Sequence, residues 1–483
     1  MPGISRRRLL AAAASAAALP RAAFSAEAGA LGALASFWDV IVIGSGLAGL
    51  TAAVSAREAG AERVLILEKG PLAGGHSLYA SGSIAVLSPK RQKRYGFEDS
   101  EELWVEDAVK AGDTPDRERV RSLARHSEEA VDWLEAHGVV FADYVYQAMG
   151  DLHRRSVIAQ GNGAGRRYVI ALVDAAQKLG VRVLYNARAH ALVPAGPGLP
   201  AGIETECGAE RRTLACAAAV IASGGFTANI PMRLRYDERL TADIPTTANP
   251  FGLYWDGSTG DGIAMGGMLD ADVRGMENFI LLPYAGGRLL DYAGADIYLN
   301  SRGERFVNET STTREVIDAL FHQPGRYMWV LTDSASRKGA TLGLKLTNGA
   351  VHRSETLAEV ARGMQISRSA LEASLNAYNE AARGKAADPL GRTLFAQTIE
   401  KPPFYWGRES PLVHMTLGGL VTDAASRLLD REGRPIEGYW AAGETVGGIF
   451  GRGRPGGMSL VSCLVEGLAA GRGAAGRAAA FRG

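Results

Sequence analysis

The clearest pattern of apolar positions lies near the start of the chain. The apolar run Val40 to Ile43 leads into Gly44-x-Gly46-x-x-Gly49, and the residues that follow have the Ala- and Leu-rich spacing of a helix. A second apolar run, VLIL, ends at Glu68. A strand, a glycine-rich turn, a helix and a second strand in this order predict a βαβ unit.

This βαβ unit has the residues that a dinucleotide requires. Gly44 permits a tight turn, Gly46 lets the backbone approach a pyrophosphate, and Gly49 allows the helix to pack closely. The helix N-terminus attracts the anion, and Glu68 at the end of the second strand can accept hydrogen bonds from ribose hydroxyls. The alternative, a strand–helix turn without a ligand, explains the glycines but not the acid.

The pattern changes in the middle of the chain, where the glycine runs become rare. Two amphipathic helical stretches stand there, REVIDALF and TLAEVARGMQISRSALEASLNAYNEAARG. We therefore expect an α/β protein in which a Rossmann-like domain, residues 38–272 and 409–483, carries an inserted α+β capping domain, residues 273–408.

Residues 1–30 differ from the rest and are excluded from the predicted fold. An arginine cluster, Arg6 to Arg8, precedes a short Ala/Leu run and small-residue cleavage motifs, which resembles a twin-arginine export signal. The alternative is an Ala-rich leader or an anchor helix, but the apolar run is shorter than the ~20 residues that span a bilayer. We expect a periplasmic mature protein without a membrane span.

Composition limits the remaining function classes. The chain has 483 residues, is 47% hydrophobic and has a formal net charge of +1, so it can bury a large core but offers no general attraction for nucleic acid. The three cysteines are scattered and form no C-x-x-C-H motif, so we expect no attached haem, and we predict no metal site.

Four further motifs occur in order along the chain: KGPLAGGHSLYASGS, AAAVIASGGF, STGDGIAMG and GYWAAGETVGG. With the glycine turn, they resemble the flavoprotein family of succinate dehydrogenase, fumarate reductase, aspartate oxidase, urocanate reductase and 3-ketosteroid dehydrogenase. The resemblance implies FAD as the cofactor, with the AAGET glutamate on the ribitol and the last helix facing the flavin. The implied cofactor-binding residues are Gly44, Gly46, Gly49, Glu68, Lys69, Gly75, His76, Ser77, Gly82, Ser83, Gly224, Asp261, Glu444, Gly457, Ser459 and Leu460.

His76 raises the question of a covalent flavin. It stands where the succinate dehydrogenase type has the histidine linked to the flavin, whereas soluble fumarate reductases have asparagine there. Gly75 replaces the serine that usually precedes that histidine. Two alternatives therefore stay open: covalent FAD through His76, or a histidine that only hydrogen-bonds beside the cofactor.

The segment FGRGRPGG near the end of the chain contains two arginines, Arg452 and Arg454. Fumarate reductase-like members grip a substrate carboxylate with an arginine in this loop and a histidine before a Gly-Gly pair, which implies Arg454 and His414. An arginine fork matches a carboxylate well, so the pair favours an anionic substrate. The alternative for His414 is a hydrogen-bonded core histidine, and Arg452 is expected to be solvated.

A third cation, Arg314 in RGERFVNETSTTRE, matches the arginine that delivers a proton to the substrate carbon in these enzymes. The alternative is a second carboxylate clamp, because an arginine pKa above about 12 makes proton transfer difficult. Asp291 is the implied acid of the proton relay. Leu282 stands where fumarate reductases have a histidine for the second carboxylate, so fumarate itself is not the expected substrate.

Together these features predict an exported FAD-dependent oxidoreductase that acts on a CH–CH group and reduces the C=C bond of an α,β-unsaturated carboxylate. Electrons are expected from a separate donor, such as a cytochrome or a reduced flavin carrier. The alternatives are a dehydrogenase that works in the oxidative direction, as on succinate or a 3-ketosteroid, and an FAD-carrying electron-transfer subunit.

Overall fold

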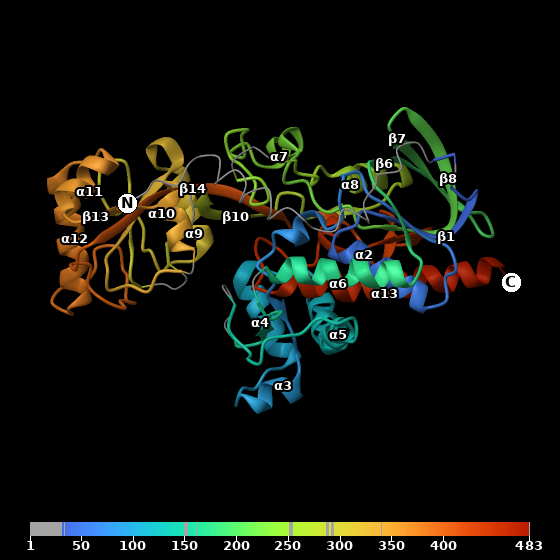
Figure 1. Ribbon diagram of the computed structural model, residues 1–483, viewed down its shortest axis with the longest axis horizontal. Coiled ribbons are helices and arrows are strands. Elements are labelled where there is room, and N and C mark those ends of the chain that lie inside the picture. The colour runs from blue at the N-terminus through green and yellow to red at the C-terminus, as the bar shows by residue number, and fades with distance from the viewer. Residues whose placement is uncertain are drawn as a thin grey trace, which may run out of the picture.

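The computed structural model of the 483-residue chain describes residues 31–32, 34–148, 153–161, 163–250, 255–285, 289–290, 294–339 and 341–482. Two predictions fall outside these residues: the export signal, residues 1–30, and the relay acid Asp291. The fold is a mixture of helices and sheets arranged in two regions joined by long strands (Figure 1).

The predicted βαβ unit is confirmed as the centre of the larger region. Strand β1 (Phe37–Ile43) is followed by α2 (Leu47–Glu58) and by β2 (Val64–Leu67), which pairs parallel with β1. On its other edge β1 pairs parallel with β8 (Glu210–Ile221). All but one residue of β1 and every residue of β2 are buried, as expected for parallel strands covered on both faces.

The rest of this sheet places later segments beside the βαβ unit. Its strand order is β16-β17-β8-β1-β2-β5, and β7 extends it by pairing with β8 and with β6. These further strands are β5 (Arg182–Leu184), β6 (Ala187–Val193), β7 (Ala201–Cys207), β16 (Arg427–Leu429) and β17 (Pro435–Ala441). Strands from near both ends of the chain, β1 and β17, thus belong to one sheet, in which β8 lies between them.

Helix α13 (Met458–Arg482) packs along α2 (Figure 1). Small residues make this close contact possible: a Cβ at Gly467 would lie 2.8 Å from the backbone oxygen of Ala48, and one at Gly471 would lie 2.3 Å from that of Ala52. The region also contains α3 (Pro89–Arg94), α4 (Glu101–Gly112), α5 (Arg117–Ala136), α6 (Ala164–Lys178), α7 (Ile230–Tyr236), α8 (Asp261–Gly266), and the short pairs β3 (Ile84–Ala85) with β4 (Ser156–Val157) and β9 (Val273–Arg274) with β15 (Gly419–Leu420).

The second region is built on an antiparallel sheet with the order β10-β14-β12-β11, in which β13 also pairs with β14. Its strands are β10 (Phe279–Ala285), β11 (Ile297–Leu299), β12 (Met328–Thr332), β13 (His352–Ser354) and β14 (Phe404–Thr416); its helices are α9 (Thr313–Phe321), α10 (Leu342–Thr347), α11 (Leu357–Met364) and α12 (Arg368–Ala382). Apolar clusters here are separate from the large core around β1 and α2.

The second of the two predicted helical stretches is in fact two helices. Gln365 takes a left-handed conformation, φ 56°, and ends α11, and the side chain of Ser367 then accepts a hydrogen bond from the backbone of Ala370 and begins α12. The apolar spacing continues across this break, which is why periodicity alone joined the two.

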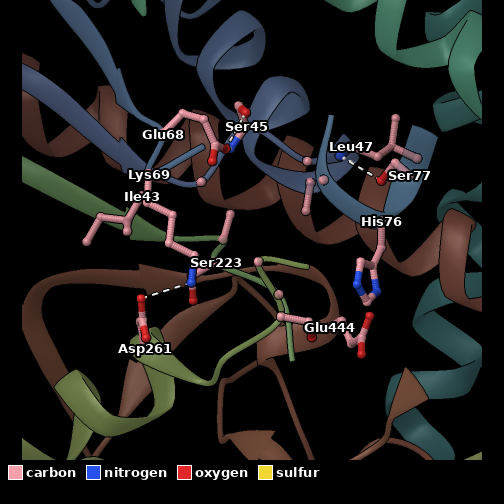
Figure 2. A pocket seen from close by; sticks show the side chains of 18 of the residues that line it. Ile43, Ser45, Leu47, Glu68, Lys69, His76, Ser77, Ser223, Asp261 and Glu444 are labelled. Carbon is pink, nitrogen blue, oxygen red and sulfur yellow. Dashed lines mark hydrogen bonds and ion pairs between the residues drawn. The ribbon is translucent and has the colours of Figure 1, made fainter. Parts of the chain in front are cut away.

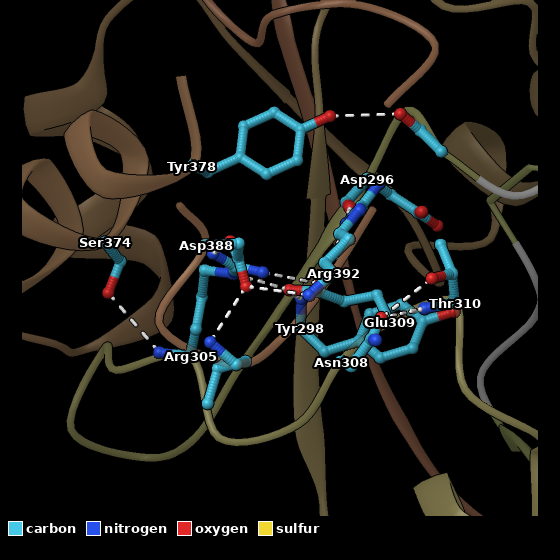
Figure 3. A network of polar contacts seen from close by, with 12 residues as sticks. Asp296, Tyr298, Arg305, Asn308, Glu309, Thr310, Ser374, Tyr378, Asp388 and Arg392 are labelled. Carbon is cyan, nitrogen blue, oxygen red and sulfur yellow. Dashed lines mark hydrogen bonds and ion pairs between the residues drawn. The ribbon is translucent and has the colours of Figure 1, made fainter. Parts of the chain in front are cut away.

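A buried ionic network lies inside the second region (Figure 3). Arg305 Nε lies 2.7 Å from one carboxylate oxygen of Glu309, Arg392 Nη1 lies 2.8 Å from the other, and Arg305 also pairs with Asp388. All four side chains are almost completely buried. The network ties the loop before α9 to the chain after α12.

Strand β14 connects the two regions, and it changes register where it enters the larger one. Ile280 pairs with Met415 but the next residue, Leu281, pairs with Val413, so His414 is the extra residue of a β-bulge. A bulge redirects side chains relative to the sheet. Within the described part of the chain, no helix is both long and apolar enough to cross a membrane.

Candidate functional site

A cavity of about 310 Å³ opens where β1, β2 and β8 end at the N-terminus of α2 (Figure 2). The carboxyl ends of parallel strands are the usual place for ligands in such sheets. Ten of the predicted cofactor-binding residues line it: Gly44, Gly46, Glu68, Lys69, Gly75, His76, Ser77, Gly224, Asp261 and Glu444. They come from six separate segments of the chain.

The turn after β1 depends on two of its glycines. Gly44 has φ +103°, and a Cβ there would lie 2.4 Å from the backbone oxygen of Ala222. A Cβ at Gly49 would lie 2.0 Å from the backbone oxygen of Gly44. Both positions therefore exclude any side chain, because the turn and the first helical turn of α2 are in direct contact.

Gly46 differs from these two because a Cβ there would meet nothing closer than 3.9 Å. It is the N-cap of α2, whose first turn contains no acidic side chain, and it lines the cavity. The backbone N–H of Leu47 donates to Ser77 Oγ at 3.1 Å. The cavity thus meets the positive end of a helix dipole, where Ser77 Oγ accepts a hydrogen bond from one of the free N–H groups.

Glu68 is held by groups that the motif analysis missed. Its carboxylate accepts hydrogen bonds from the backbone N–H of Ser45 at 3.0 Å and of Gly70 at 2.7 Å, and from the Ser45 hydroxyl (Figure 2). These bonds fix the carboxylate in the cavity wall. Ser45 could have been found from the sequence, because it is the variable residue between the first two glycines of the turn.

Lys69 and Asp261 form an ion pair across the cavity, with Nζ 3.0 Å from Oδ2 (Figure 2). Arg188 approaches the other oxygen of Asp261 at 3.1 Å. Burial opposes ionisation of Asp261, but Lys69 outweighs it, so the pKa of this carboxyl is lowered. Asp261 therefore joins segments that are far apart in the sequence, and Arg188 was not foreseen.

His76 lies between two carboxyl groups in the cavity. Its Nε2 is 2.7 Å from Asp256 Oδ1, and its ring points toward Glu444 (Figure 2). Burial would lower the pKa of His76, but Asp256 and Glu444 raise it above its ordinary value. Burial would raise the pKa of Asp256, but the hydrogen bond from His76 lowers it to about 2.

Glu444 is held differently from Asp256. Its Oε1 accepts a hydrogen bond from the backbone N–H of Thr416 at 3.0 Å, and burial raises the pKa of its carboxyl. Neither Asp256 nor Thr416 belongs to a motif noted in the sequence. Thr416 lies two residues beyond His414 on β14, but the bulge at His414 made their relation unpredictable from alternation.

The bulge in β14 places His414 and Met415 close to the last loop. His414 Nδ1 is 3.1 Å from Thr247 Oγ1, and Arg454 Nε is 3.3 Å from Met415 Sδ. Burial lowers the pKa of His414, and the charges of Arg454 and His76 lower it further, to about 3. His414 is therefore neutral at ordinary pH, and Arg454 supplies the positive charge of the pair.

The other two predicted catalytic residues lie elsewhere or outside the described residues. Arg314 is in the first turn of α9, its side chain is 52% exposed, and its Nε is 3.8 Å from Asp318. It does not line the cavity, although α9 packs against β10, the partner of β14. Arg452, the expected solvated residue, pairs with Asp113 at the surface.

Five other predicted cofactor residues border this region without lining the cavity. Gly82 has φ +93° and accepts a hydrogen bond from Tyr168, and the hydroxyl of Ser83 contacts that of Tyr146. Gly457 has φ +75° and packs on β3, ahead of Ser459 and Leu460 in the first turn of α13, where Ser459 Oγ lies 3.2 Å from Met415 Sδ. These residues form a second wall near Arg454.

The residues present fit an extended dinucleotide such as FAD. An anion would meet the helix end at Gly46, where a Cβ would protrude into open space, and ribose hydroxyls would meet the fixed carboxylate of Glu68. The cavity continues from there past His76 to Glu444. A second nucleotide half can therefore extend toward Arg454 and His414.

Comparisons with known proteins agree with this assignment. The family model described as "FAD binding domain" matches residues 39–460. The NADH:fumarate oxidoreductase of Klebsiella pneumoniae (strain 342) is 30% identical over 466 residues, which cover 94% of this chain and 49% of the relative. The chain thus spans about half the length of that relative.

A second relative and a solved structure cover more of their own length. The urocanate reductase of Eggerthella lenta is 30% identical over 90% of this chain and 74% of its own. The open conformation of a flavocytochrome c3 fumarate reductase superposes with a TM-score of 0.79 at 26% identity, covering 99% of this chain and 82% of that chain.

Proposed function

This chain belongs to the FAD binding domain family, and from that premise we propose that it reduces the C=C bond of an α,β-unsaturated carboxylate. It is an FAD-dependent oxidoreductase, and its relatives include proteins named for fumarate and urocanate, both of which are unsaturated carboxylates. The observation that carries the proposal is that Arg454 contacts Met415, the residue after His414, while burial and the charge of Arg454 lower the pKa of His414 to about 3.

The cavity residues hold FAD in this proposal. Backbone N–H groups at the start of α2 bind the pyrophosphate, Glu68 binds the ribose of the adenosine half, and Glu444 binds the ribitol. When bound and reduced, FAD supplies the hydride that is transferred to the β-carbon of the substrate. Every other step depends on side chains of this chain.

Arg454 and His414 bind the substrate carboxylate. Arg454 offers a planar, permanently charged fork, and its Nε donates to the sulfur of Met415. His414 is neutral and its Nδ1 contacts Thr247, so its Nε2 is directed to the substrate as a hydrogen-bond partner without a second charge. One charge and one neutral partner suit a single carboxylate.

Arg314 delivers the proton to the α-carbon in this proposal. Its side chain is half exposed, and its Nε lies 3.8 Å from Asp318. Proton transfer from arginine requires a site without bulk water. Catalysis therefore requires that substrate or a movement of α9 cover this side chain, and Asp291 is the acid that we propose to resupply the proton.

We propose a substrate with one carboxylate and an apolar or aromatic tail. Leu281 and Leu282 of β10 are partly exposed, and Phe279 and Phe321 pack nearby. A second carboxylate against Leu282 would lose hydration without gaining a donor. Urocanate has one carboxylate and a ring, and the urocanate reductase relative agrees with this preference.

To test this, the protein is reduced with dithionite and mixed with each of a panel of unsaturated carboxylates. The visible absorbance of the flavin then measures how fast each compound reoxidises it. Acrylate-type and aryl enoates should reoxidise the flavin faster than fumarate. Fumarate as the fastest substrate would contradict the tail assignment, and no reoxidation by any enoate would contradict the reaction. Reduction of the oxidised protein by saturated acids or by 3-ketosteroids would support the dehydrogenase alternative instead.

His76 decides whether the cofactor is covalent. Because Nε2 of His76 already pairs with Asp256 and the pKa of His76 is raised, we propose that the imidazole stays protonated and binds the cofactor non-covalently. Acid precipitation should leave the flavin in the supernatant. Yellow fluorescence that travels with the denatured chain would instead identify His76 as the attachment point.

Export and the electron donor form a separate proposal. The arginine cluster, Arg6 to Arg8, before the Ala/Leu run supports twin-arginine export to the periplasm, where a cytochrome or reduced flavin carrier would donate electrons. Replacing Arg6 and Arg7 by lysine should retain the full-length protein in the cytoplasm, as measured by cell fractionation. Unchanged periplasmic activity in this variant would contradict that route.

A further inference from the structure

One aromatic side chain at the rim of the cavity is unusually exposed. All seven tryptophans lie in the described residues, and Trp255 alone is largely exposed, with 56% of its surface accessible. Tryptophan is highly buried on average, so an exposed indole that lines a cavity indicates a ligand contact. Tyr79 and Leu72, also exposed, line the same cavity.

The indole lies at the end of the cavity that Glu68 marks. A Cβ at Gly70 would lie 2.7 Å from the Trp255 ring, and one at Gly257 would lie 2.6 Å from it. The ring edge is therefore held between two glycine backbones. The position of a Cβ at Gly70 is also 3.1 Å from the carboxylate of Glu68. The indole and the ribose-binding acid are therefore close neighbours.

We propose that Trp255 stacks on the adenine ring of FAD and closes the adenosine end of the cavity. Glu68 takes the ribose, and the base attached to that ribose must lie within a few ångströms of the carboxylate, where the indole stands. Ala187 and Ala189 line the same end with small side chains, which leaves room for a flat ring. The inference rests on FAD as the cofactor but not on the substrate.

The geometry explains two features that the cofactor motif leaves unexplained. Any side chain at Gly70 or Gly257 would displace the indole, so both glycines are needed for Trp255 to reach the cavity. An exposed aromatic face costs little when base stacking covers it in the bound state.

The first test uses the holoenzyme as purified. Oxidation by N-bromosuccinimide, mapped by mass spectrometry of peptides, should modify Trp255 slowly because adenine covers it. The half-buried Trp133, on α5 and hydrogen-bonded to Glu58, gives the reference rate within the same sample. Oxidation of Trp255 well before Trp133 in the flavin-loaded protein would overturn the proposal.

The second test measures affinity rather than activity. Trp255→Ala should weaken FAD binding by about tenfold or more, the usual effect of losing one base–aromatic stack, and Trp255→Phe should retain most of the affinity. ADP, which lacks the flavin half, should quench the fluorescence of the cofactor-free wild-type protein and of Trp133→Phe, but not that of Trp255→Phe.

The outcomes separate this inference from the proposed function. If Trp255→Ala bound FAD and ADP as tightly as the wild type does, the stacking proposal would be wrong. The proposed reduction of enoates would not be affected by that result. If FAD is covalent and cannot be removed, the oxidation rate of Trp255 decides alone. Thermal unfolding of the cofactor-free variants should match that of the wild type, because Trp255 is exposed and supports no core.

Discussion

At the scale of single residues, specific contacts within the protein hold the charged side chains of the site. Lys69, Arg188 and His76 each contact an aspartate. Arg454 donates hydrogen bonds to the sulfur of Met415 and to the backbone oxygen of Pro455. In the proposed function, the substrate carboxylate binds to this guanidinium.

Arg454→Ala should reduce kcat/KM for carboxylate substrates by about 3–5 kcal/mol of transition-state binding, because the substrate charge loses its bidentate partner. FAD content should not change. The matched control is Arg452→Ala. Arg452 lies in the same loop as Arg454 but is exposed and pairs with Asp113, so its removal should leave the kinetics unaffected. Activity of Arg454→Ala within about tenfold of the wild type, ~1.4 kcal/mol, would exclude the clamp.

The His76–Asp256 pair should make stability depend on pH. The raised pKa of His76 means that its contribution is complete below its ordinary value of 6.5 and is lost as pH rises through the folded-state pKa. The lowered pKa of Asp256 means that its contribution is complete above 3.8 and is lost as pH falls toward about 2. The pair therefore stabilises most between these two ordinary values.

Asp256→Asn should accordingly lower the free energy of unfolding by about 2 kcal/mol in weak acid, the size of a hydrogen bond between charged groups. The loss should be smaller at alkaline pH, above the folded-state pKa of His76, because the neutral ring no longer pairs with the carboxylate. Urea unfolding at both pH values measures it. A destabilisation that is the same at both would show that the contact is not an ion pair.

At the scale of elements, the junction between β1 and α2 contains three glycines with different roles. Gly44 and Gly49 are enclosed by backbone atoms, whereas Gly46 borders the cavity. The same spacing in the sequence therefore combines two positions required by the fold with one required by the ligand.

Gly46→Ala should fold with nearly unchanged stability, because a Cβ there meets only atoms 3.9 Å away, but it should lose FAD because the methyl group occupies the anion site. Gly49→Ala should lower the free energy of unfolding by about 1–3 kcal/mol through overpacking against Gly44. Flavin content and urea midpoints measure the two effects.

Gly476→Ala in α13 is the control for this pair of variants, because a Cβ there meets nothing within 4 Å. It should retain FAD and gain up to about 1 kcal/mol of stability from helix propensity. If Gly46→Ala instead retained FAD with wild-type affinity, the anion would not bind at the start of α2.

At the scale of the whole molecule, two cores are joined by β10 and β14. The ionic network of Arg305, Glu309, Asp388 and Arg392 belongs to the second region only, and the cavity belongs to the first (Figures 2 and 3). A mutation in the network should therefore destabilise the region around α9 before it weakens binding of the cofactor.

Glu309→Gln should destabilise the second region by about 3–5 kcal/mol, because it leaves Arg305 and Arg392 buried with too little negative charge. Limited proteolysis should cut between residues 300 and 400 while FAD stays bound. The control, Glu372→Gln, removes an exposed pair with Arg368 and should change stability by less than about 1 kcal/mol. Simultaneous loss of flavin and of the second region would show that the two cores unfold as one unit.

The sequence alone determined the βαβ unit and the family, because these depend on motifs whose residues are a few positions apart. Gly44, Gly46 and Gly49 act within one turn, and Glu68 ends the next strand. Only the tertiary structure decided which side chains meet across long separations. Asp256 reaches His76, Thr416 reaches Glu444, and Trp255 reaches Gly70 through the packing of separate segments.

The sequence did not predict the break between α11 and α12 or the bulge at His414, and both failures have the same cause. Apolar spacing records which face of an element is buried, and it passes unchanged through a single left-handed residue such as Gln365. A bulge is likewise defined by the partner strand. Ile280 pairs with Met415 and Leu281 pairs with Val413, so His414 has no partner residue in β10. The pairing of strands far apart in the chain thus set the direction of the His414 side chain, and no local pattern contains that information.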